Sequence, residues 1–136
     1  MRIVIPPANE LTPPPVPPAA YRAKIVGGKY VTSSNGNPML KAEVMLLSQG
    51  PVAEIKTVGR KLIDQIVITE ETLWRLNLVF KACTGADLPA GKDFSVEELI
   101  NFVMSNILNK ECVVATDNES YQGQLRSKIK GYNPIV

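Results

Sequence analysis

The fold is decided by residues 21–47, which read YRAKIVGGKYVTSSNGNPMLKAEVMLL. The first part predicts a strand over residues 21–32, in which Gly27 and Gly28 mark a bulge or a sharp bend. Turn-forming residues follow, and Asn35 with Gly36 is the strongest short signal for a hairpin. The rest of the stretch is the returning strand, so a β-hairpin opens the fold.

Beyond this hairpin the sequence predicts more strands and two helices. The returning strand and the later strands are expected over residues 39–47, 59–68, 111–116 and 121–132, with a turn at residues 117–118. Thr69 is expected to cap a first helix that begins at Glu70 and Glu71 and ends at Gly85. Ser95 forms a capping box with Glu98 before a continuous apolar face, so the helix that follows is the best specified element.

The elements come in the order of three strands, a helical section and two strands. This order favours an α+β fold, mainly β, built as a five-stranded OB-like Greek-key barrel with a two-helix section between strands 3 and 4. A meander sheet covered on one face by both helices is the competing architecture. Seven of the eleven prolines precede Ala19, which predicts an extended, unpacked proline-rich arm over residues 1–19 and an OB-like domain over residues 20–136.

Composition limits the classes of function. The chain has 136 residues, 45% of them hydrophobic, and a net charge of +2, which is typical of one globular domain. It has no histidine, and it lacks the phosphate-loop, dinucleotide-binding, zinc-protease and serine-hydrolase motifs. Cys83 and Cys112 cannot build a tetrahedral metal site alone. We therefore expect no enzyme, no metal and no cofactor, and the short apolar runs predict neither a signal peptide nor a membrane helix.

Charge is divided unevenly along the chain. Residues 21–69 and 112–136 together carry ten basic and five acidic side chains, whereas residues 70–111 carry four basic and seven acidic ones. The strands therefore provide a basic surface and the helices an acidic one. A protein with this division can hold a polyanion although it is nearly neutral overall.

The last predicted strand carries a row of cations. Arg126, Lys128 and Lys130 lie two residues apart, so they are expected on one side of the strand together with Tyr132. Such a row suits the phosphates of a single nucleic-acid strand, and a neighbouring aromatic ring can stack on a base. Lysines also protect edge strands from aggregation, so both explanations stay open.

Three other side chains have structural as well as functional interpretations. Trp74 lies among apolar residues in the first turn of a helix and is expected in the core rather than on a stacking surface. Tyr30 precedes the first hairpin turn, where OB-fold loops commonly contact single strands, but it equally suits cross-strand packing. Asp64 is expected to form a structural ion pair with Arg60 or Lys61.

A family resemblance rests on the order and spacing of several short segments. These segments are residues 21–25, 32–44, 59–64, 72–76, 80–82 and 121–132. Together they resemble a family of small tailed-phage proteins that are single-stranded-DNA-binding-like and often carry only the description of a domain of unknown function. The resemblance covers roughly residues 20–134, and it implies an OB-fold that coats single-stranded DNA during phage DNA replication or recombination.

The resemblance also implies which side chains contact DNA. The basic residues of the last strand, the Arg60 and Lys61 pair and Lys41 are the expected phosphate contacts, and Tyr132 and Tyr30 are the stacking candidates. The full set of candidate nucleic-acid-binding residues is Arg22, Lys24, Tyr30, Lys41, Arg60, Lys61, Arg126, Lys128, Lys130 and Tyr132.

The sequence therefore predicts a non-catalytic protein that binds single-stranded DNA with little sequence preference. The expected partners are single-stranded DNA, other copies of the chain through residues 1–19, and phage replication or recombination enzymes, with no membrane. The expected location is the cytoplasm, that of the host cell if a phage encodes the chain. The alternative is a structural or assembly protein, for example of a virion, that uses its proline-rich arm for subunit contacts.

Overall fold

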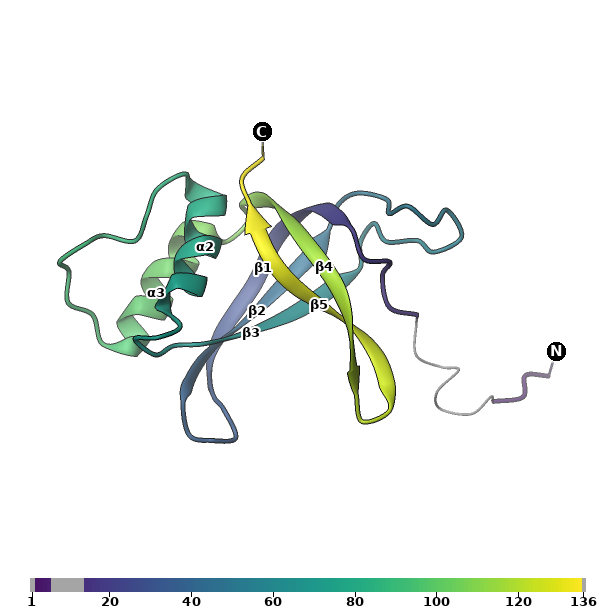
Figure 1. Cartoon of the computed structure of the whole chain (residues 1–136), viewed down its shortest axis with the longest axis horizontal. Helices are drawn as coiled ribbons and strands as arrows, with labels where there is room; N and C mark the ends of the chain where they lie inside the picture. Colours follow the sequence, from purple (N-terminus) through teal and green to yellow (C-terminus); the bar gives the residue numbers. More distant parts are fainter. Residues whose placement is uncertain (1, 6–13, 136) are drawn as a thin grey trace.

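The computed structural model describes residues 2–5 and 14–135 and, for Tyr121, the backbone alone. Its elements are β1 (Ala20–Thr32), β2 (Pro38–Leu46), β3 (Lys61–Val67), α2 (Leu73–Thr84), α3 (Val96–Ile107), β4 (Glu111–Tyr121) and β5 (Gln124–Asn133). The expected order of three strands, two helices and two strands is confirmed (Figure 1). The chain has an α+β fold that is mainly β.

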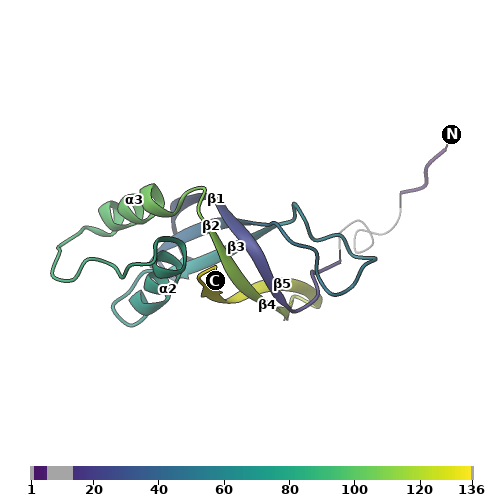
Figure 2. The same cartoon turned by 90° about the horizontal axis from the view of Figure 1, so that it is seen from above.

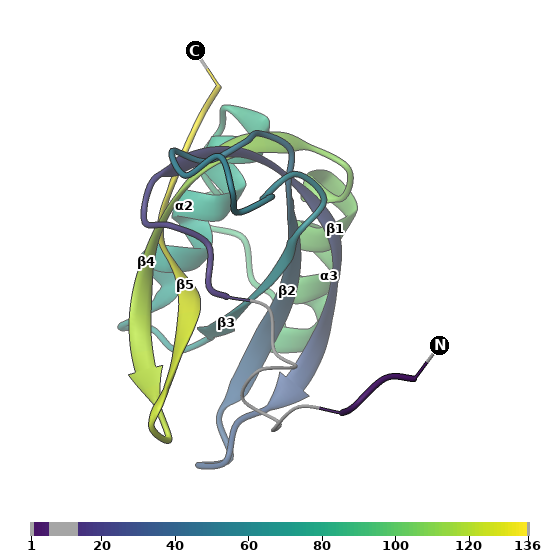
Figure 3. The same cartoon turned by 90° about the vertical axis from the view of Figure 1, so that its right-hand side faces the viewer.

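The five strands form one antiparallel sheet in the order β3-β2-β1-β4-β5. Strand β1 pairs with both β2 and β4, so the competing expectation of a simple meander is wrong. The sheet curls until its two edge strands, β3 and β5, approach each other (Figure 3). No backbone ladder joins these edges in the described part of the chain, so the sheet is curved but not closed.

The core lies inside this curve, and the two helices cover one end of it (Figures 1 and 2). Every second residue of β2 points inward, and Leu40, Ala42, Val44 and Leu46 are fully buried. Helix α3 packs closely on β1, because a Cβ atom added to Gly28 would lie 2.6 Å from the Met104 sulfur. Glycine at this position lets the helix approach the strand.

Two irregularities bend strands of the sheet, one in the central strand β1 and one in the edge strand β5. In β1 the pairing with β2 shifts between Ile25 and Gly27, which confirms the bulge expected at the glycine pair. In β5, Ile129 pairs with Thr116 and Gly131 pairs with Ala115, so Lys130 is an extra residue. A bulge adds one residue to a strand and increases its twist.

The two helices differ in how well the sequence predicts their ends. Helix α3 begins after Ser95, whose hydroxyl accepts a hydrogen bond from the Glu98 amide at 3.1 Å, as expected. Helix α2 begins at Leu73, so the expected start at Glu70 is wrong, although Gly85 does end the helix with φ +79°. The hydroxyl of Thr72 donates to the Val67 carbonyl at 2.6 Å, which holds residues 69–72 in a turn.

The β4–β5 hairpin is longer than expected. The turn predicted at residues 117–118 is wrong, because β4 continues to Tyr121 and the chain reverses at Gln122 and Gly123. Both turn residues have positive φ, +51° and +79°. This is the two-residue turn that follows the twist of antiparallel strands.

The end of the proline-rich arm packs against the sheet. Val16 is fully buried, and its backbone N–H donates to the Ser127 hydroxyl at 2.8 Å. The Tyr21 hydroxyl donates to the Pro17 carbonyl at 2.5 Å. The expectation of an unpacked arm is therefore wrong for this part, whereas residues 6–13 lie outside the described residues.

Candidate nucleic-acid interface

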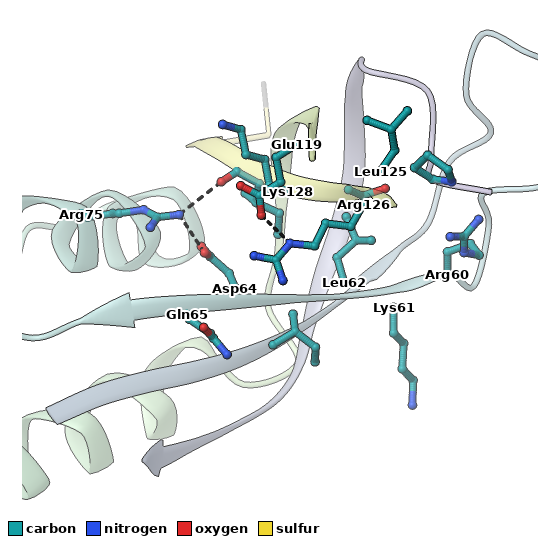
Figure 4. A pocket seen from close by; sticks show the side chains of 14 residues that line it. Arg60, Lys61, Leu62, Asp64, Gln65, Arg75, Glu119, Leu125, Arg126 and Lys128 are labelled. Atoms are coloured by element: carbon teal, nitrogen blue, oxygen red, sulfur yellow. Dashed lines mark hydrogen bonds and ion pairs between the residues drawn. The ribbon is translucent and has the colours of Figure 1, made fainter. Parts of the chain in front are cut away.

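A groove runs along the open seam between β3 and β5 (Figure 4). Its volume is about 480 Å³, and we call it the seam groove. The lining residues of β3 and the residue before it are Arg60, Lys61, Leu62, Ile63, Asp64 and Gln65. The other wall comes from Pro15, Arg75, Glu119 and residues 125–129. The groove exists because the two edges approach each other without pairing.

A buried polar cluster joins the two edges at one end of this groove. Asp64 of β3 accepts a hydrogen bond from the Tyr132 hydroxyl at 2.6 Å and pairs with the Arg75 guanidinium at 2.7 Å. Arg75 of α2 also donates to the Ile129 carbonyl of β5 at 3.2 Å (Figure 4). We call these three side chains the Asp64 cluster. Asp64 thus forms its ion pair with Arg75, and the expected partners Arg60 and Lys61 are wrong.

Burial sets the protonation behaviour of this cluster. Only 6% of Asp64 is exposed, and this burial raises the pKa of its carboxyl, although the Tyr132 hydroxyl and the Arg75 guanidinium offset part of the effect. Burial and the facing carboxyl raise the pKa of Tyr132 well above its usual value. Tyr132 therefore remains a hydrogen-bond donor to Asp64 at neutral pH.

Three predicted cations border the seam groove. The Arg126 guanidinium lies against Glu119 across the β4–β5 hairpin, with an Nε–Oε1 distance of 2.6 Å. Arg60 and Lys128 form no ion pair with any described residue, and Lys128 is exposed. Their charges are therefore available to an anion in the groove.

The fourth predicted cation at this place points elsewhere. Lys61 extends to the other side of β3 from Arg126 (Figure 4), where its ammonium lies 3.5 Å from the Glu43 carboxylate. Alternation along a strand explains this, since Leu62 next to it faces the core. Lys61 thus belongs to the outer face of the sheet.

That outer face carries a second hollow of about 310 Å³. It is lined by Gly28, Lys29, Lys41, Glu43 and Ile63. Lys29 of β1 and Lys41 of β2 are direct partners in the sheet. Two like charges in this position repel each other and destabilise the free protein, so an anion bound between them would reduce this repulsion.

The remaining predicted residues are spread over the sheet. Arg22 pairs with Glu111 at 2.8 Å on the outer face, and Lys24 lies half-buried on the same strand. Tyr30, 46% exposed, lies near the end of β1. Lys130 is exposed at its bulge and does not line the seam groove.

Tyr132 is the clearest departure from the expected site. The extra residue at Lys130 shifts the alternation of β5, so Ile129 and Tyr132 both face the core. The Tyr132 ring is only 5% exposed, and the expectation that it shares a surface with Arg126 and Lys128 is wrong. The groove is instead lined by the exposed aliphatic residues Leu125, 62% exposed, and Ile63, 46% exposed, which also lines the hollow on the outer face described above.

The sequence interpretation missed Arg75 and Lys29. Arg75 enters the site through folding of α2 against the sheet, and no local pattern marks it. Lys29 could have been found from the hairpin register, which places it beside Lys41 once the turn at Asn35 is assigned. A third missed feature is Trp74, which is 63% exposed and not part of the core as expected.

The described residues contain no group of three or more acidic, cysteine or histidine side chains that could hold a metal ion. Among the same residues no helix has the length and apolarity needed to cross a membrane.

The sequence profile of one protein family, described as "Protein of unknown function (DUF669)", matches residues 8–136. The chain belongs to this family. The match begins before β1, so the DUF669 pattern includes the buried Val16, whereas the expected resemblance started only at about residue 20. The curated proteins contain no match to this DUF669 chain.

Proposed function

We propose that this protein binds single-stranded DNA, without catalysis and largely without sequence preference, in phage DNA replication or recombination. The strand order supports an OB-like barrel, because β1 lies between β2 and β4 and the helices connect β3 to β4. In the proposal the two edge strands, β3 and β5, complete the barrel by lying close together without backbone pairing. The protein would act in the cytoplasm of the host cell.

The observation that carries the proposal is the chemistry of the seam groove. Arg60 and Lys128 offer positive charge without an ion-pair partner among the described residues, and the exposed aliphatic residues Ile63 and Leu125 also line the groove. A single strand presents phosphates on one side and unstacked base faces on the other, so it can use both kinds of surface. A duplex hides its base faces and would meet only the charges.

The mechanism is phosphate neutralisation with apolar support for the bases. Arg126 is held by Glu119, so it is oriented along the groove before any ligand arrives. Ile63 and Leu125 give bases an apolar surface that does not distinguish one base from another. Tyr30 can add stacking only at the end of β1. The lysine pair Lys29 and Lys41 would extend the path of the phosphates onto the outer face.

A titration of fluorescent oligothymidine at several salt concentrations tests the proposal. We expect binding at low salt that weakens steeply as salt rises, and weaker binding of a duplex of equal length. Log affinity falls as log salt rises, and in the double variant R60A/K128A this fall should be less steep. The magnitude of the slope should decrease by roughly 1.4, about 0.7 for each lost phosphate contact. The matched control is K92A/K110A, which removes two exposed lysines outside both hollows.

Two results would overturn the proposal. One is no binding of oligothymidine at low salt, and the other is equal binding of single strand and duplex. A control variant that weakens binding as much as R60A/K128A would show that the groove is not the site.

A further inference from the structure

Helix α2 carries an apolar surface that the fold leaves uncovered. Trp74 is 63%, Leu78 39% and Leu73 38% exposed. Trp74 and Leu78 are four residues apart, so they lie side by side on the helix face turned away from the core. We call these three side chains the Trp74 patch. Single exposed apolar side chains are ordinary, but a largely exposed tryptophan with two leucines is typical of a protein contact.

The N-terminal segment is the second uncovered apolar feature. Ile3 is 74%, Val4 89% and Ile5 73% exposed, and Arg2 precedes them. Three consecutive β-branched side chains gain free energy when they are buried against another apolar surface. Arg2 adds a positive charge at one end of this segment.

The charges of the two features are complementary. Glu70 and Glu71 are exposed directly before α2, so carboxylates lie at the end of the Trp74 patch. The helical section as a whole has more acidic than basic residues, seven against four. The N-terminal segment has one cation followed by three apolar side chains, so it matches this surface both in charge and in apolar character.

The N-terminal segment and the Trp74 patch lie far apart in one molecule, so we expect the segment that occupies the patch to come from a second copy. Residues 2–5 lie at the end of the molecule opposite α2 and α3 (Figures 1 and 2). Val16 is buried in the core and bound to Ser127, which fixes the root of the arm away from the helices. The segment of one chain is thus directed outward, and the patch of another chain can receive it.

We propose that residues Arg2–Ile5 of one copy dock on the Trp74 patch of a second copy. Each copy then offers one segment and one patch at opposite ends, so the contact is heterologous and can repeat from copy to copy. If the proposed function holds, such rows would let neighbouring copies bind a long single strand cooperatively. The docking itself needs no DNA.

Tryptophan fluorescence of the full chain tests the docking directly, because Trp74 is the only tryptophan in the sequence. As the protein concentration rises, we expect a shift of the emission to shorter wavelength, protection from acrylamide and an increase in mass by sedimentation. In V4D these changes should require at least about 30-fold more protein, as for the loss of a central interface side chain. V58D is the matched control, since Val58 is 59% exposed in the loop before β3.

W74F, measured by sedimentation alone, should weaken association in the same direction as V4D. The charge reversal R2E should also weaken it, and the pair R2E with E70K/E71K should restore part of it. Oligothymidine of one site's length should bind V4D as tightly as the unchanged chain, which separates this test from that of the groove.

Several results would overturn the inference. The first is a chain that stays monomeric with unchanged emission at all concentrations. The second is association that persists in V4D, or that V58D removes equally. The third is emission that is already shifted at high dilution and is restored to longer wavelength by V4D, because the segment would then dock on its own helix.

Discussion

Removing the Tyr132 hydroxyl is the sharpest test of how the open seam is held. In Y132F the ring stays in the core, but Asp64 loses a hydrogen bond of 2.6 Å and keeps the Arg75 guanidinium and the backbone N–H of Gln65. A hydrogen bond to a charged group contributes about 1.5–3 kcal/mol, and here its loss weakens the support of a buried carboxylate. We therefore expect the free energy of unfolding at pH 7 to fall by about 2 kcal/mol.

Urea unfolding followed by circular dichroism measures this change. The matched control is Y30F, which removes the hydroxyl of a tyrosine that is 46% exposed and should alter stability by less than about 0.5 kcal/mol. In a double-mutant cycle, Y132F and D64N should show a coupling of about 1–2 kcal/mol because the two side chains share one hydrogen bond. If Y132F is as stable as Y30F, the hydrogen bond does not hold the seam, and the reasoning fails.

Three further predictions concern the same fold. Because the folded pKa of Tyr132 is raised well above 10, its contribution is complete below about pH 10 and is lost as pH rises further; the unfolding free energies of Y132F and the unchanged chain should therefore converge as pH rises above about 10 in urea titrations. V16A should lose about 1–2 kcal/mol by thermal unfolding, since Val16 is fully buried, whereas P14A at an exposed position should lose little. S95A should lose about 1 kcal/mol through its missing helix cap, and equal stability of S95A and the unchanged chain would contradict the cap observed here.

The sequence predicts those parts of the fold that depend on neighbouring residues. The cap at Ser95 needs only the amide of Glu98 three residues later, and the first hairpin needs only a turn and two alternating strands. The bulge at Gly27 is equally local, because glycine marks the place where a strand can bend. Each of these features can be recognised within a window of a few residues.

The features that could not be predicted depend on contacts between distant segments. Asp64 finds Arg75 eleven residues away and Tyr132 sixty-eight residues away, so its nearest cations in the sequence are misleading. Val16 lies among prolines that indicate an extended arm, and its place depends on packing in the core and on the distant β5 residue Ser127. Trp74 lies among apolar residues in the first turn of its helix, yet α2 turns this side chain away from the core.

For the candidate site the same division holds. Alternation along β5 places Arg126 and Lys128 together at the seam groove, as the spacing predicts. The prediction from alternation fails beyond Ile129, because the bulge adds one residue and the side chains after it change sides. The stacking role expected for Tyr132 disappears at that point, and the hydroxyl instead serves the Asp64 cluster.

Lys130, the extra residue of the β5 bulge, has no partner in the pairing with β4. Pairing with β4 does not require it, since Ile129 and Gly131 already oppose consecutive residues of β4. A chain from which Lys130 is deleted would keep a regular ladder with Ile129 and Tyr132 both facing inward, but its last strand would be straighter. This extra residue thus contributes to the curvature that brings β5 round toward β3, together with the bulge of β1, and a change of length at this position would alter that curvature without exchanging any core side chain.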